Sequence, residues 1–155
     1  MGFMARLRAQ AAAIGALVVA GCGMSEPDPV PDACIDEPAA IERALARAPA
    51  QVRLEDGTAL SQCVHLAAPR GGELQALGVT LTRVADGLRS GALTDPDAAM
   101  RLGYLVGAVR RGAAKTPGLA AQLARRIEQT ATFDSDDARA RAALLRGVQL
   151  GEDGG

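Results

Sequence analysis

Aromatic side chains are almost absent from this chain of 155 residues, and histidine occurs only once. The aromatic residues are one tyrosine and two phenylalanines, and there is no tryptophan. This excludes recognition of nucleic acid bases by stacking, which needs several aromatic faces. A lone His65 excludes a metal site built from several histidines. The formal net charge of −1 gives the chain no overall attraction to nucleic acid.

Converging catalytic groups are also missing from the sequence. Gly71 and Gly72 lack the strand, the spacing and the lysine of a phosphate-binding loop. Ser61, Cys63 and His65 are close in sequence, but on a helix we expect them to scatter around the axis. We therefore expect no cofactor, no metal and no catalysis. The alternative is an enzyme, or an accessory to one, that uses the region Ser61–His65.

The N-terminal segment has the pattern of a secretory signal. Arg6 and Arg8 are the only charged residues before Glu26, and an apolar run of about a dozen residues follows them. As a helix this run would reach about 20 Å, short of the roughly 30 Å hydrocarbon core of a membrane. Basic residues, a short apolar run and small residues at its end predict export from the cytoplasm.

The end of this segment, Val19-Ala20-Gly21-Cys22, resembles the lipobox of bacterial lipoproteins. The resemblance covers residues 1–22 only. It implies that residues 1–21 are a signal peptide, removed by cleavage before Cys22, and that the Cys22 thiol carries a diacylglyceryl group. The new amine is often acylated, for example with palmitate. Several acyl chains hold a protein firmly at a membrane, whereas one holds it marginally. The resemblance therefore implies an exported protein, anchored to the bacterial membrane in the cell envelope.

The odd number of cysteines agrees with lipidation of Cys22. The chain has three, and if Cys22 carries lipid, Cys34 and Cys63 remain to pair, as two thiols of an exported domain usually do. Such a bridge would contribute about 3 kcal/mol by restricting the unfolded chain. The alternative is a reactive thiol at Cys63 beside His65, but residues two apart on a helix point in different directions.

The rest of the chain predicts an all-α fold. Residues 22–35 alternate proline with acidic residues and predict an extended, disordered linker. Residues 36–150 predict a compact bundle of about five to six short helices, and residues 151–155 a disordered tail. The expected helices lie near residues 36–48, 58–67, 74–90, 94–111, 116–127 and 135–148.

Three details of the later helices lead to specific expectations. Gly103 and Gly107 are one turn apart, which predicts a close approach of two helices inside the bundle. Tyr104 lies between them and is expected to cover the edge of the core with its hydroxyl in water. The last helix is expected to bury one apolar face. That face consists of Ala138, Ala142, Leu145 and Val148.

One basic cluster is the candidate binding surface. It consists of Arg110, Arg111, Lys115, Arg125 and Arg126. If the two helices that carry it form an antiparallel hairpin, its arginines would suit bidentate contacts with an anionic envelope component or an acidic protein partner. The alternative is that Arg110 and Arg111 complement the C-terminus of their own helix, and that the other bases serve solubility.

Taken together, these features predict a lipid-anchored envelope protein whose helical domain binds or scaffolds a partner and does not catalyse a reaction. A second possibility is a carrier that holds a small apolar ligand in a cavity between alanine-rich and leucine-rich helices.

Overall fold

The computed structural model describes residues 28–35, 37–132 and 136–155. The predicted signal peptide and Cys22 lie outside these residues. The described chain is all-α, as predicted, and forms seven helices without a strand. The helices are α1 (Asp32–Ile35), α2 (Pro38–Leu45), α3 (Leu60–Ala67), α4 (Gly71–Ala92), α5 (Pro96–Ala113), α6 (Leu119–Ala131) and α7 (Ala138–Gly154).

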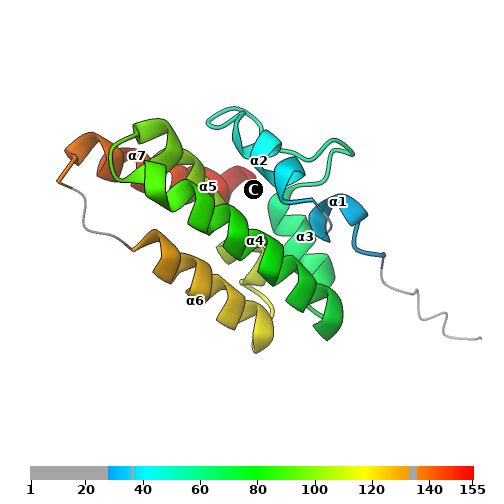
Figure 1. The fold of residues 1–155 in the computed structure, drawn as a ribbon. Helices are drawn as coiled ribbons and strands as arrows, with labels where there is room; N and C mark the ends of the chain where they lie inside the picture. The colour runs from blue at the N-terminus through cyan, green and yellow to red at the C-terminus, as the bar shows by residue number, and fades with distance from the viewer. Residues whose placement is uncertain (1–27, 36, 133–135) are drawn as a thin grey trace, which may run out of the picture.

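Helix α5 is the centre of the bundle and packs against α3, α4, α6 and α7. Its buried residues, among them Leu102, Leu105 and Val109, lie on all sides of the helix. Figure 1 shows α4 and α6 side by side, α7 lying along α5, and the short helices α1 to α3 gathered at one end. A helix with apolar residues on all sides is typical of the centre of a bundle, where other helices cover each of its faces.

Local sequence signals explain where the long helices begin. The Asp95 carboxylate accepts a hydrogen bond of 2.9 Å from the backbone N–H of Asp97, and Pro96 occupies the first turn of α5. Asp137 caps α7 in the same way, by accepting from the N–H groups of Arg139 and Ala140. Both caps satisfy backbone donors that have no partner inside the helix.

The predicted disulfide is present. Cys34 on α1 and Cys63 on α3 are bonded, with their Cα atoms 5.7 Å apart, and both residues are buried. Cys63 is therefore not a free thiol, and the bridge ties the N-terminal end of the described chain to the core.

The last part of the predicted linker is not extended, so that prediction is wrong for residues 32–35. These residues form the single turn α1, which adds a seventh helix to the expected five or six. Tertiary contacts hold the turn: Cys34 is bridged, and the Thr80 hydroxyl donates a 2.6 Å hydrogen bond to the Ile35 carbonyl oxygen. A proline-rich composition does not reveal such long-range contacts.

The predicted disordered tail is also wrong. Residues 151–154 form the last turn of α7, and Gly151 and Gly155 are buried. Arg111 on α5 donates hydrogen bonds to the backbone carbonyl oxygens of Glu152 and Asp153, which satisfies acceptors at the end of α7. This glycine-rich segment is therefore helical because a side chain from α5 binds its backbone carbonyl groups.

The face that α7 turns to the core differs from the expected one. Ala138, Ala142 and Leu145 are exposed, Leu145 to 70%, and Val148 is only half-buried. The buried residues of α7 are Ala140, Gly147 and Gly151. The helix packs mainly through small residues, so the positions of its large side chains do not mark the interface.

The predicted close approach at Gly103 and Gly107 is confirmed. Both glycines face the α7 backbone, and neither position has room for a β-carbon. Tyr104 between them differs from expectation, because it is only 3% exposed. Burial raises the pKa of its phenol above the ordinary value.

Candidate functional site

A groove runs along α3 beside the C-terminal end of α5. Its first part is a cavity of about 420 Å³. The lining residues are Ser61, Gln62 and His65 from α3, and Arg111, Gly112, Ala114 and Lys115 from the end of α5 and the residues after it. A second cavity of about 290 Å³ adjoins the first at His65. Leu66, Pro69 and Thr116 line it together with His65. We call the two cavities together the α3–α5 groove.

Gly112 brings the two helices together at the base of the groove. A β-carbon at this position would lie 2.6 Å from Cβ of Val64 and would overlap the Ser61 carbonyl oxygen. Only glycine permits this contact, because real β-carbons do not approach other atoms so closely. The close contact places the side chains that follow Gly112 next to α3.

Ser61 and His65 share one face of α3, so the expectation that the two scatter around the helix is wrong. They are four residues apart, a spacing that places side chains one above the other on the same face. Cys63 points elsewhere, into the core and the disulfide. The Ser61 hydroxyl donates a hydrogen bond to the backbone oxygen of Gly155. Its O–H bond therefore points at a backbone acceptor, and a base that activates the hydroxyl would have to displace this hydrogen bond.

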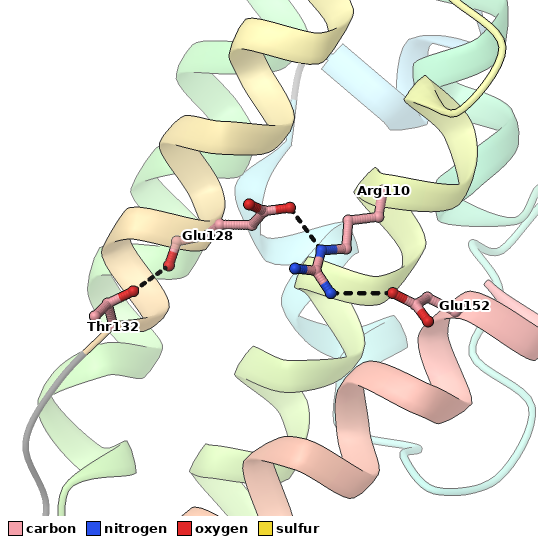
Figure 2. A network of polar contacts seen from close by, with 4 residues as sticks. All are labelled: Arg110, Glu128, Thr132 and Glu152. Carbon is pink, nitrogen blue, oxygen red and sulfur yellow. Dashed lines mark hydrogen bonds and ion pairs between the residues drawn. The ribbon is translucent and has the colours of Figure 1, made fainter.

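Arg110 is at the centre of an ion-pair network between three helices (Figure 2). Its Nε lies 2.5 Å from Oε1 of Glu128 on α6, and its Nη1 lies 3.1 Å from Oε1 of Glu152 on α7. The hydrogen bond to Glu128 is the main cause of the raised pKa of Arg110. Thr132 extends the network by donating a 3.1 Å hydrogen bond to the Glu128 carbonyl oxygen. Two carboxylates therefore balance the charge of Arg110 within the fold.

Arg111 differs from Arg110 in the charge of its partners. It donates to the carbonyl oxygens of Glu152 and Asp153, which are neutral groups. These bonds orient the guanidinium without neutralising it. Among the ion pairs of the described residues, none involves Arg111 or Lys115. The groove therefore keeps both positive charges.

The five predicted basic residues thus occupy different settings. Arg110 is ion-paired with Glu128 and Glu152 at the surface, whereas Arg111 and Lys115 line the α3–α5 groove. Arg125 and Arg126 are exposed on α6, and Arg126 borders another cavity, of about 310 Å³, between α4 and α6. Arg110 and Arg111 do lie in the last turn of their own helix, but their hydrogen bonds reach α6 and α7.

Sequence reasoning missed how these residues combine. The region Ser61–His65 and the basic pair Arg111 and Lys115 were separate candidates, and the structure places them in one groove. Gly112 and Ala114, which also line the first cavity, carry no functional group that marks them as site residues in the sequence. The four-residue spacing of Ser61 and His65 was the available signal.

The cavities described here open to solvent, so none of them is the enclosed apolar cavity that a carrier within the bundle would need. In the described part of the chain, no group of three or more histidine, cysteine or acidic residues is arranged to hold a metal ion. Across residues 28–35, 37–132 and 136–155, no helix combines the length and the apolar character that crossing a membrane requires.

Comparisons with protein-family models, with curated proteins and with solved structures found no match to this chain.

Proposed function

We propose that this chain is a lipid-anchored protein of the bacterial cell envelope whose helical domain binds a partner or ligand. The observation that supports the proposal most strongly is that two of the three cysteines pair with each other and leave the third, Cys22, without a disulfide partner in the chain. Cys34 and Cys63 pair in a buried disulfide, which is typical of exported proteins, and Cys22 is left at the end of a lipobox-like sequence.

The surroundings of the groove favour binding over catalysis. The Ser61 hydroxyl donates a hydrogen bond to a backbone oxygen, and carbonyl groups hold the Arg111 guanidinium at the rim. A positioned guanidinium and an ammonium group suit the recognition of an anion. The domain would present this groove near the membrane surface.

Lipidation at Cys22 is tested with the full chain expressed in a bacterium that is fed an alkyne analogue of palmitate. We expect the label in the membrane fraction, and an N-terminal peptide that begins at a modified Cys22. Cys22→Ala should abolish labelling and leave residues 1–21 attached. Met24→Ala, just outside the lipobox, is the matched control and should be labelled normally. An unmodified Cys22 thiol in the wild-type chain would contradict the proposal.

A serine hydrolase is the second candidate, because Ser61 and His65 line the same cavity. A fluorophosphonate probe, which reacts with activated serine hydroxyls, separates the two functions. A binding protein should show no labelling that depends on Ser61. Labelling of the wild type that Ser61→Ala removes would favour the hydrolase.

A further inference from the structure

We propose that the α3–α5 groove binds a single-chain amphiphile with an anionic head, such as a fatty carboxylate or an alkyl phosphate. This inference deepens the binding role proposed above and rests on it only for the cellular setting, because the chemistry of the groove does not require the anchor.

The charged part of the groove fits an anionic head. Arg111 and Lys115 bring two positive charges to the first cavity, and no acidic side chain lines either cavity. Arg111 is already oriented by two carbonyl oxygens, so little side-chain freedom remains to be lost on binding. Gln62 and His65 add polar groups at the same rim.

The continuation of the groove fits an apolar chain. Beyond His65 its walls come mainly from Leu66 and Pro69, and Gly112 and Ala114 line the first cavity near the cations. The first cavity, of about 420 Å³, is in the range of small-molecule sites, roughly 300–1,000 Å³, and the second, of about 290 Å³, lies just below it. A cationic cavity that shares His65 with a mainly apolar cavity is complementary to an amphiphile whose chain lies against Leu66 and Pro69.

Other anions fit less well. The imidazole of His65 is the one aromatic ring among the residues that line the groove, so a nucleotide base would find a single ring to stack on and no Phe, Tyr or Trp. A small inorganic anion would leave the apolar second cavity unused. An acidic protein surface would contact the exposed cations but would not fill that cavity. A protein held at a lipid surface also meets amphiphiles at high local concentration.

Photocrosslinking tests the proposal with the full chain, as recovered from bacteria, in nanodiscs of neutral lipid. The probe is octanoate that carries a diazirine in its alkyl chain, and mass spectrometry locates the modified residues. We expect modification at Leu66, Pro69, Ala114 or Thr116. Octanoate or octyl phosphate should compete, and the stronger competitor identifies the preferred head group. Octanol should compete at least tenfold more weakly.

Two variants test the steric and the electrostatic parts of the proposal separately. Ala114→Phe obstructs the first cavity from an exposed position, and Lys115→Glu reverses one charge at the rim of the same cavity. At a probe concentration well below saturation, where labelling is proportional to affinity, each should reduce crosslinking about tenfold. Ala142→Phe and Arg89→Glu make the same changes at exposed positions outside the groove and should leave labelling unchanged. Thermal unfolding of each variant shows that the fold is retained.

Modification spread over the surface, or equal competition by octanol, would overturn the proposal. Labelling that persists in both groove variants would also overturn it. The same mass spectra show whether Cys22 carries lipid. The proposed lipid anchor and the proposed amphiphile site can therefore be contradicted independently of each other. Groove labelling on a chain without lipid contradicts only the anchor, whereas a lipidated chain without groove labelling contradicts only the amphiphile site.

Discussion

Gly103 on α5 and Leu144 on α7 lie backbone against backbone. A β-carbon added to Gly103 would lie 3.0 Å from the Leu144 carbonyl carbon and would overlap its oxygen. Gly107, Gly147 and Gly151 repeat this arrangement along the same pair of helices. Helix α7 is therefore held by close backbone packing with α5, where many weak dispersion contacts add up.

The glycine contacts predict that Gly147→Ala destabilises the fold. The new β-carbon would lie 2.9 Å from the backbone nitrogen of Tyr104 and 3.1 Å from Cα of Gly103, so the helices must separate. We expect a loss of about 1–3 kcal/mol in the free energy of unfolding, measured by chemical denaturation.

Gly87→Ala is the matched control, because Gly87 is exposed in the interior of α4 and no heavy atom lies within 4 Å of its added β-carbon. Alanine is the better helix former, and this change should stabilise the fold by up to about 1 kcal/mol. Equal shifts of the same sign in the two variants would show that the α5–α7 contact is unimportant.

Removal of the disulfide should destabilise the chain. The bridge joins residues 29 positions apart, and Cys34→Ala with Cys63→Ala should cost about 3 kcal/mol, largely because the unfolded chain gains freedom. Denaturant unfolding with and without a reductant measures the effect. The wild type should lose stability in the reductant, and the double variant should not respond to it. A reductant-insensitive wild type would argue against the bridge, provided that the reductant reached the unfolded state.

Tyr104 should make stability depend on pH in alkaline solution. Burial raises the pKa of the folded state above 10.0, so the folded chain holds the phenolic proton more tightly than the unfolded chain does. This contribution is fully present below about pH 10 and is lost as the pH rises toward the higher folded value. Because Tyr104 is the one tyrosine and tryptophan is absent, phenolate absorbance reports this group directly.

We expect the absorbance midpoint of the folded chain above that of the chain in denaturant. Tyr104→Phe should remove the corresponding part of the alkaline loss of stability. Identical midpoints in the folded and denatured chains would show that the phenol is hydrated in the native state.

The Arg110 network should contribute only modestly to stability. Arg110, Glu128 and Glu152 are each about one third to one half exposed, so solvent screens their attraction. A double-mutant cycle with Arg110→Gln and Glu128→Gln should give a coupling of about 0.5–1 kcal/mol. The coupling should shrink when the ionic strength rises from about 0.1 M to about 1 M. A coupling that does not depend on salt would mean that the pair acts through packing.

Local chemistry explains what the sequence predicted correctly. The all-α class, the approximate positions of α5 and α7, and the close approach at Gly103 all follow from short-range rules of capping, periodicity and side-chain size. The pairing of Cys34 with Cys63 followed from counting cysteines, which needs no coordinates.

The errors concern contacts between distant parts of the chain. Local composition marked residues 32–35 and 151–155 as irregular, but Thr80 and Arg111 supply the hydrogen bonds that order them. The helical spacing of Ala138, Ala142, Leu145 and Val148 predicts a buried face, yet Leu145 is exposed and α7 packs through Gly147 and Gly151. Glycine contributes no hydrophobic side chain, so a hydrophobic pattern cannot reveal an interface that it forms.

The sequence alone determined the helical class, the cysteine pairing and the resemblance that implies a lipid anchor at Cys22, because each of these depends on neighbouring residues or on composition. Only the tertiary structure decided that Arg110 is balanced by carboxylates while Arg111 keeps its charge beside Ser61 and His65. The physical reason is that electrostatic environment depends on distance in space, and the packing of α3, α5 and α7 sets those distances.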